Sequence, residues 1–159
     1  MILCLVGTNP YDFSRLVKTL DDIAPKLDLP VVIQTGNTTY QPINCEFFTF
    51  KPKEEVHKLL QSADLVITQG GYGSMTDAIM MHKKLIAVPR LQMYGEAQDN
   101  QSELVEYFES KGYLKACMQI EELEDMICNA LKGEYIFKPY ESETEIKVNR
   151  LIKEFLNEL

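Results

Sequence analysis

Short apolar runs alternate with helix-type patterns along most of this chain, and the alternation restricts its fold more than any other feature. Strands are expected at residues 2–6, 31–34, 45–50, 65–68, 85–88 and 115–118. Helices are expected at residues 10–23, 53–62, 74–82, 100–111 and 121–131. Strands separated by helices pair in parallel, and right-handed crossovers place helices on both faces. The pattern predicts a single Rossmann-like, doubly wound α/β domain with a mainly parallel sheet of about six strands.

Polar loops follow four of the expected strands. They are Gly7-Thr8-Asn9, Gln34-Thr35-Gly36, Gly70–Ser74 and Arg90–Gln101. In a doubly wound fold, ligands bind outside the carboxyl ends of the strands. Four such loops at one edge of one sheet therefore indicate a binding site more strongly than any single loop. Asn9 and Pro10 also suit the start of the first helix, as its cap and first residue.

The segment from Leu65 to Asp77 carries the strongest chemical signal. An apolar strand ends in a glycine-rich turn, and a helix follows with Ser74 at its start and Asp77 about one turn later. Glycine lets the backbone approach an anion, and the N–H groups at a helix N-terminus point toward it. An acid such as Asp77 suits the hydroxyls of a ribose. A site for a phosphate-bearing ligand is predicted; a tight turn in an ordinary α/β protein is the alternative.

The composition argues against several other classes of function. A formal net charge of −8 argues against a nucleic-acid partner, since phosphate backbones attract clustered Lys and Arg. No apolar run reaches the length of a membrane span, and the N-terminal segment lacks the basic region of a signal peptide. The four cysteines form no C-x-x-C pair, and the two histidines fall on separate expected helices. We expect a cytoplasmic protein with free thiols and with neither a metal site nor a cofactor.

The C-terminal segment is expected to be an amphipathic helix distinct from the ligand-binding domain. Domain bounds are placed at residues 1–140 and 141–159. The apolar face of the helix comprises Val148, Leu151, Ile152, Phe155, Leu156 and Leu159. This helix either completes the core of its own domain or docks on a partner subunit.

The loops, taken in order over residues 1–131, resemble a known family. The motifs that carry the resemblance are Val6-Gly7-Thr8, Ile33-Gln34-Thr35-Gly36, the run from Ala63 to Asp77, Gly95-Glu96 and Asp99-Asn100-Gln101. They resemble the C-terminal, donor-binding domain of family 28 glycosyltransferases of the MurG type. They also resemble the small subunits of two-part transferases that make dolichol-linked chitobiose or bacterial exopolysaccharide. The resemblance implies one half of a GT-B fold.

The resemblance also implies roles for individual residues. Asp77 would bind the ribose, Phe50 would lie against the uracil, and Gln101 with Asp99 would contact the sugar. Glycine N–H groups and Ser74 would receive the diphosphate without a metal. The complete expected donor-binding set is Gly7, Thr8, Gln34, Thr35, Gly36, Phe50, Gln69, Gly71, Gly73, Ser74, Asp77, Glu96, Asp99, Asn100 and Gln101. Arg15 and Arg90 are further candidates for phosphate contact, because guanidinium suits that geometry. No catalytic residue is assigned.

Three positions depart from the family pattern. Relatives often carry histidine where this chain has Gln69 and Asn100, and Ala97 likewise replaces a frequent histidine. An imidazole can carry a proton or a positive charge at neutral pH, whereas an amide does neither. The departures imply that the donor or the pyrophosphate contact differs here, or that activity is weakened.

The expected function is the UDP-sugar-binding subunit of an inverting two-component glycosyltransferase, a hexosyltransferase. It would act on a lipid-linked acceptor in capsule, exopolysaccharide or glycolipid assembly. A membrane-anchored acceptor-binding subunit would recruit it to the inner face of the membrane. Two alternatives remain: a non-catalytic nucleotide-sugar-binding regulatory or scaffold subunit, and an unrelated Rossmann-like nucleotide-sugar enzyme such as an epimerase fragment. The missing G-x-G-x-x-G after the first strand disfavours NAD.

Overall fold

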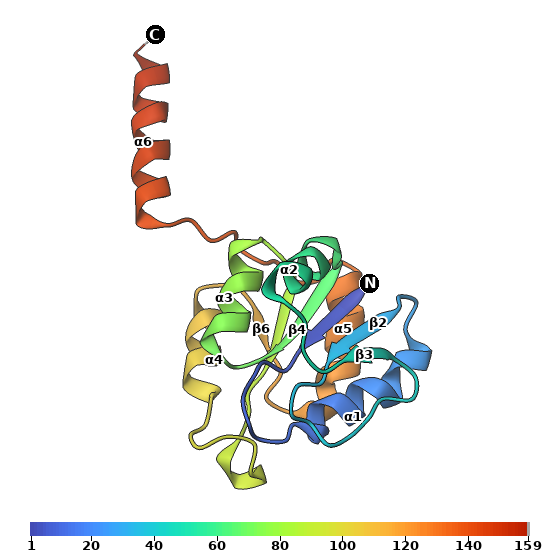
Figure 1. The fold of residues 1–159 in the computed structure, drawn as a ribbon. Helices are drawn as coiled ribbons and strands as arrows, with labels where there is room; N and C mark the ends of the chain where they lie inside the picture. Colours follow the sequence, from blue (N-terminus) through green and yellow to red (C-terminus); the bar gives the residue numbers. More distant parts are fainter. Residues whose placement is uncertain (159) are drawn as a thin grey trace.

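The computed structural model describes residues 1–158, except the side chain of Thr144; Leu159, assigned above to the C-terminal helix, lies outside this range (Figure 1). The sheet contains β1 (Ile2–Leu5), β2 (Val31–Gln34), β3 (Glu46–Phe48), β4 (Leu65–Gln69), β5 (Leu85–Val88) and β6 (Lys115–Ala116). The α-helices are α1 (Ser14–Ile23), α2 (Lys53–Ser62), α3 (Tyr72–Met80), α4 (Ser102–Ser110), α5 (Leu123–Leu131) and α6 (Glu143–Asn157). Single 3₁₀ turns are η1 (Ala24–Lys26), η2 (Gln92–Tyr94) and η3 (Ile120–Glu122).

The sheet has the order β3-β2-β1-β4-β5-β6, and every pairing in it is parallel. This arrangement confirms the predicted doubly wound α/β fold. The strand order reverses between β1 and β4, which is where folds of this kind leave a ligand crevice. Leu5 at the end of β1 pairs with Gln34 on one side and with Thr68 on the other. The loops that follow β1, β2 and β4 therefore leave the sheet at the same edge.

Helices cover both faces of the sheet, and the strand residues divide between the two cores (Figure 1). Successive side chains of a strand point to opposite faces. Ile2 and Cys4 of β1 accordingly pack with α1 and α5, whereas Leu3 and Leu5 pack with α2, α3 and α4. The central strands are apolar on both faces for this reason. This two-sided core fixes the carboxyl edge on which the polar loops stand.

Two helix starts differ from the sequence-based expectation. Asn9 does not cap α1, because its Oδ1 accepts a hydrogen bond from the N–H of Tyr11 at 2.9 Å and the helix begins only at Ser14. The predicted helix start at Pro10 is therefore wrong. Helix α3 begins at Tyr72, and the extended backbone of Gly71 precedes it at φ −78° and ψ 142°. Ser74 consequently lies inside the first turn of α3.

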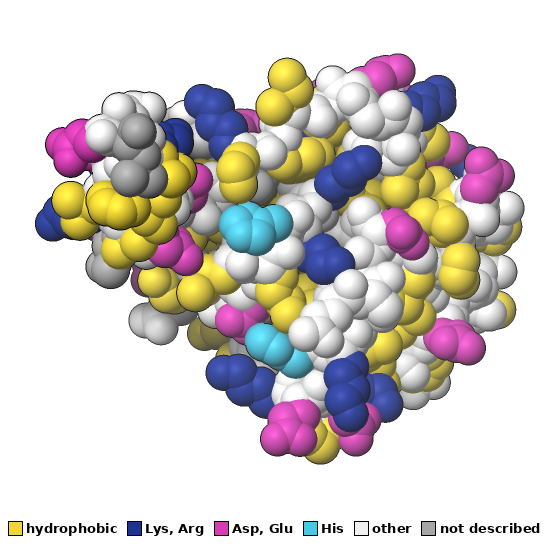
Figure 2. Space-filling model, turned by 90° about the horizontal axis from the view of Figure 1, so that it is seen from above, with side chains coloured by type: hydrophobic (Ala, Val, Ile, Leu, Met, Phe, Trp, Pro, Cys, Tyr) yellow, Lys and Arg dark blue, Asp and Glu magenta, His cyan; other side chains and the backbone are white. Residues whose placement is uncertain are grey.

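Helix α6 stands away from the rest of the domain (Figure 1). A capping box fixes its start, because Ser142 and Glu145 exchange side-chain to backbone hydrogen bonds. Its apolar side chains are exposed, with Leu151 at 64% and Phe155 at 61%. They gather on one side of the helix, seen end-on in Figure 2. The structure therefore does not show α6 completing the core of its own domain.

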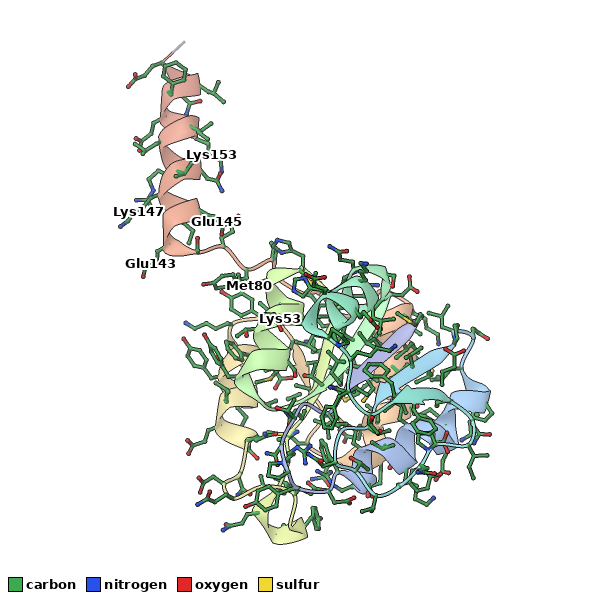
Figure 3. The ribbon with its side chains drawn as sticks, in the orientation of Figure 1. Lys53, Met80, Glu143, Glu145, Lys147 and Lys153 are labelled. Atoms are coloured by element: carbon green, nitrogen blue, oxygen red, sulfur yellow. The ribbon has the colours of Figure 1, made fainter. Side chains whose placement is uncertain are left out.

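The segment that leads into α6 passes the C-terminal end of α3, where Met80 lies (Figure 3). Figure 3 also shows Lys147 and Lys153 on α6, distant from the sheet. Between α3, α4 and this segment lies a groove of about 520 Å³. Its apolar lining includes Met80, Phe108 and Tyr140. Within residues 1–158, no helix combines the length and the apolar character needed to cross a lipid bilayer.

Candidate functional site

Three of the expected ligand loops contact one another at the carboxyl edge of the sheet. Gly36, after β2, has φ +53°, and a Cβ built there would lie 2.7 Å from the carbonyl oxygen of Gly7. The same Cβ would lie 3.8 Å from the ring of Phe50, after β3. Gly7 has φ +78°, and its Cβ would lie 2.0 Å from Nε2 of Gln69 at the end of β4. Both turns favour glycine because their φ angles are positive, and at Gly36 a side chain would also collide with the backbone of the neighbouring loop.

Several residues of the expected donor-binding set form internal side-chain hydrogen bonds that hold these loops. They are Gln34, Thr35, Gln69, Glu96, Asn100 and Gln101. Gln34 accepts through Oε1 from the N–H of Gly7 at 3.3 Å, and the hydroxyl of Thr35 donates to the carbonyl of Phe48 at 3.2 Å. Gln101 accepts through Oε1 from the N–H groups of Gly70 at 2.9 Å and Arg90 at 3.0 Å. Gln101 thus ties the end of β4 to the end of β5. These side chains support the site because they join the strand ends and loops to one another.

Glu96 is one of these residues, and both of its carboxylate oxygens accept hydrogen bonds. It is 3% exposed, and it accepts from Arg15 Nε at 2.7 Å and Nη2 at 3.0 Å. Its Oε2 also accepts from the N–H of Leu91 at 2.9 Å. The bidentate pair is the strong geometry for a guanidinium and a carboxylate. It fastens the loop after β5 to helix α1, so Arg15 serves as a loop clamp and its expected phosphate role finds no support.

Arg90, placed directly after β5, is the most heavily bonded side chain of the site. It is 1% exposed, and its guanidinium lies 4.5 Å from the centre of the Phe13 ring. It donates to the carbonyls of Val6 at 2.9 Å, Tyr11 at 2.9 Å and Glu96 at 3.1 Å, and to Oε1 of Gln69. This single side chain therefore joins the loops that follow β1, β4 and β5.

The charge of Arg90 is retained at neutral pH. Burial lowers the pKa of its guanidinium to about 10, while the nearby carboxylates of Glu96 and Asp12 act in the opposite direction. The guanidinium is enclosed and bonded to protein carbonyls, so this arrangement does not offer it for the phosphate contact that the sequence suggested for Arg90. Sequence reasoning missed this supporting role. The available signal was an arginine directly after a buried strand and a proline.

The first turn of α3 carries backbone N–H groups that have no acceptor within the helix. The first hydrogen bond of this helix runs from the N–H of Met75 to the carbonyl of Gly71 at 3.3 Å. The N–H groups of Tyr72, Gly73 and Ser74 precede it and have no intrahelical acceptor. A Cβ at Gly73 would meet nothing within 4 Å. These groups, together with the helix dipole, form an arrangement that favours an anion.

The remaining expected residues lie at the rim of the site. Asp77 is half-buried one turn along α3, and Thr8, Phe50 and Asp99 are exposed. Asn100 is also exposed, but its Oδ1 accepts from the N–H of Gln92 at 2.8 Å and so closes the loop after β5. The structure thus separates the expected set into residues that build the edge and residues that face outward from it.

Asp12 joins the loop after β1 to the loop after β2. Its carboxylate accepts from the N–H and hydroxyl of both Ser14 and Thr39, at 2.7 to 3.0 Å. Burial by itself raises the pKa of Asp12, but the four hydrogen bonds outweigh burial and lower this pKa to about 2. The carboxylate is therefore a stabilising group that persists to low pH.

The lowered pKa of Asp12 gives an expected pH dependence. A carboxylate with a depressed folded-state pKa stabilises the fold above its unfolded pKa of about 4 and loses this effect toward pH 2. The Asp12→Asn variant should be less stable than the parent at about pH 6, and this gap should shrink at about pH 2.5. Urea denaturation at both pH values measures it. A gap that stays constant would show that the charge of Asp12 contributes nothing.

The six-stranded parallel sheet with helices on both faces matches one half of the GT-B glycosyltransferase fold. The family model of the glycosyltransferase family 28 C-terminal domain matches residues 1–154. The chain belongs to this family. No curated protein sequence matches it.

Solved structures agree with the fold. MurG of Acinetobacter baumannii is similar with a TM-score of 0.54 and 19% identity, over 85% of this chain and 42% of MurG. The NMR structure of ALG13 is similar with a TM-score of 0.57 and 18% identity, over 94% of this chain and 92% of ALG13. A UDP-GlcNAc 2-epimerase from Neisseria meningitidis, bound to UDP-GlcNAc, has a TM-score of 0.59 and 14% identity, over 96% of this chain and 43% of the epimerase. This chain spans less than half of MurG and of the epimerase. At these identities the likenesses establish the fold alone.

Proposed function

We propose that the chain is the UDP-sugar-binding subunit of an inverting two-component glycosyltransferase that acts on a lipid-linked acceptor. The observation that carries the proposal is the open first turn of α3, flanked by Gly7 and Gly71 at the point where the strand order reverses. Membership of the family 28 C-terminal domain supports a sugar nucleotide as the ligand. An epimerase shares the sheet, so the family match favours the transferase over the epimerase alternative.

In this proposal the outward-facing residues contact the donor. The N–H groups at the start of α3, with the hydroxyl of Ser74, receive the diphosphate, and Asp77 binds the ribose hydroxyls. Phe50 is 50% exposed beside Gly36, which suits an apolar contact with the uracil. Asp99 is the outward-facing acid for the sugar. Fixed donors and the helix dipole stabilise the charge that develops on the leaving UDP.

We further propose that α6 docks on the acceptor-binding subunit. Its apolar face is exposed and continuous, with Ile146 at 41%, Leu151 at 64% and Phe155 at 61%. Contiguous exposed apolar surface of this kind marks interaction sites. The apolar groove that includes Met80 and Phe108 lies beside the segment leading into α6 and extends the surface available to this partner. A membrane-anchored partner would then hold the chain at the inner face of the membrane, next to the lipid-linked acceptor.

Calorimetric titration with UDP, UDP-glucose, UDP-galactose, UDP-N-acetylglucosamine and NAD tests the ligand. We expect selective uridine nucleotide binding, and a loss of at least about ten-fold in UDP affinity in Asp77→Ala, since a half-buried acceptor for two hydroxyls is removed. Asp28→Ala removes an exposed acid at the opposite edge of the sheet and serves as the control. Binding of NAD in preference to UDP would contradict the proposal.

A transfer assay separates the enzyme from a regulatory or scaffold subunit. The amides of Gln69 and Asn100, at positions where relatives often carry histidine, favour the non-catalytic alternative. Co-expression with the product of a neighbouring glycosyltransferase gene should give transfer from one UDP-sugar. Nucleotide binding and partner binding without transfer from any of the tested donors would instead support the regulatory subunit.

A further inference from the structure

The side-chain amide of Gln69 is held through its oxygen, while its nitrogen has no hydrogen-bond partner within residues 1–158. Gln69 is 7% exposed, and its Nε2 donates no hydrogen bond within residues 1–158. Among those residues, the enclosed side-chain polar atoms without a partner are the hydroxyls of Thr38 and Thr68. Nε2 of Gln69 is not one of these enclosed atoms, so it retains some access to solvent. A buried amide with an unused donor at the mouth of a site points to an acceptor outside the chain.

Arg90 determines which end of this amide faces outward. A guanidinium has donors and no acceptor, so the atom of Gln69 that faces Nε of Arg90 must be the oxygen. Gln101 confirms this orientation, because its Nε2 donates to the same oxygen at 3.3 Å. With Oε1 held by two donors, Nε2 of Gln69 is directed away from Arg90. The amide cannot reverse without placing its own N–H groups against the guanidinium.

The free amide lies between the two glycine turns that suit an anion. A Cβ at Gly7 would lie 2.0 Å from Nε2 of Gln69, and a Cβ at Gly71 would lie 2.9 Å from it. A side chain at either position would cover the amide. Gly71 directly precedes the first turn of α3, whose N–H groups are open. The amide donor and the helix donors therefore converge on one region.

We propose that Arg90 is a positioning residue for the diphosphate: by holding Oε1 of Gln69, it directs the Nε2 amide at a phosphate oxygen received by the first turn of α3. The donor is neutral, but it is hydrogen-bonded to a buried cation and is polarised by it. The positive charge of Arg90 matters for binding an anion because the chain carries a formal net charge of −8, and the carboxylates of Glu96 and Asp12 lie near Arg90. This inference rests on the proposed function and identifies what takes the place of a histidine at position 69.

The test is a double-mutant cycle between Gln69→Glu and Arg90→Lys. Glutamate at position 69 keeps an acceptor for Arg90 but has no donor for a phosphate, and lysine at position 90 keeps the charge but not the fork that fixes the amide. Affinities for UDP, uridine and inorganic pyrophosphate are measured by NMR titration, with the spectrum reporting that each variant is folded. Gln92→Glu adds the same charge on an exposed residue of the loop after β5 and is the matched control.

We expect Gln69→Glu to weaken UDP and pyrophosphate by at least about ten-fold and to leave uridine unchanged. Arg90→Lys should weaken UDP in the parent but cause no further loss in the Gln69→Glu background. Equal losses from Arg90→Lys in both backgrounds, or an unchanged UDP affinity in Gln69→Glu, would overturn the inference. Parallel loss of uridine affinity would also overturn it, because the effect would then lie in the whole pocket.

The three probes separate this inference from the proposed function. Pyrophosphate binding that depends on Gln69, without a preference for uridine nucleotides, would support the positioning role and contradict the UDP-sugar function. Selective UDP binding that is insensitive to Gln69 would support the UDP-sugar function and contradict the positioning role. If the parent chain binds neither UDP nor pyrophosphate, both proposals fail.

Discussion

Replacing Arg90 with methionine should destabilise the fold by about 3–5 kcal/mol, the range for breaking a buried charged network. Methionine replaces the apolar stem and the contact with Phe13 but supplies no donor. The carbonyls of Val6 and Glu96 and the amide oxygen of Gln69 would lose their charged partner while remaining buried. Unsatisfied acceptors of this kind retain their full desolvation cost.

Urea denaturation followed by circular dichroism measures the effect of Arg90→Met. Arg150→Met, on the exposed surface of α6, is the control, and it should change the free energy of unfolding by no more than about 0.5 kcal/mol. A loss below about 1 kcal/mol for Arg90→Met would show that water replaces the guanidinium and that the three loops do not depend on it.

Replacing Gly36 with alanine should also be strongly destabilising, by about 2–4 kcal/mol. Two free-energy costs add at this position, one from the backbone conformation and one from a steric clash. The backbone has φ +53°, a left-handed conformation that costs a residue with Cβ about 1–2 kcal/mol. The new methyl would lie 2.7 Å from the carbonyl oxygen of Gly7, and a backbone atom cannot move aside as a flexible side chain can. The loops after β1 and β2 would have to separate.

Gly133→Ala isolates the first of these two costs, that of the left-handed backbone. Gly133 has a similar backbone with φ +76°, but a Cβ there would meet no atom within 4 Å. It should therefore show the conformational cost alone, at about 1–2 kcal/mol. Denaturation midpoints of both variants under one set of conditions give the difference. Equal losses of stability in the two variants would mean that the turn after β2 can move without a free-energy cost. The contact between Gly36 and Gly7 would then not hold the two loops together.

Sequence periodicity predicted the fold closely because the helices and strands bury continuous apolar faces. The expected bounds of α2 and β5 coincide with those observed, since each is bordered by a residue that cannot continue the pattern. Pro52 precedes the first, and Pro89 follows the second. Helix starts without such a border shifted, as at Ser14 and Tyr72, where side-chain caps are absent and the turn geometry decides.

The candidate site was predictable as a location but not as a set of contacts. The strand order along the sequence predicted that these loops would lie at one edge of the sheet, because the strands are parallel and their carboxyl ends share that edge. Local pattern could not show whether a polar side chain faces a ligand or a protein carbonyl. Glu96 bonds to Arg15, and Arg90 bonds to the carbonyl of Val6, across 81 and 84 positions of the sequence. Such long-range pairings depend on the folded sheet and leave no mark in neighbouring residues.

The lengths of the outermost strands bear on solubility. Strand β3 has three residues and β6 has two, and these are the edges of the sheet. An unpaired edge exposes backbone donors and acceptors, and a strand from another molecule can add to it, which is how many sheet proteins begin to aggregate. Edges this brief offer an incoming strand very few backbone bonds. The open sheet is thereby protected against edge-to-edge polymerisation without closing into a barrel.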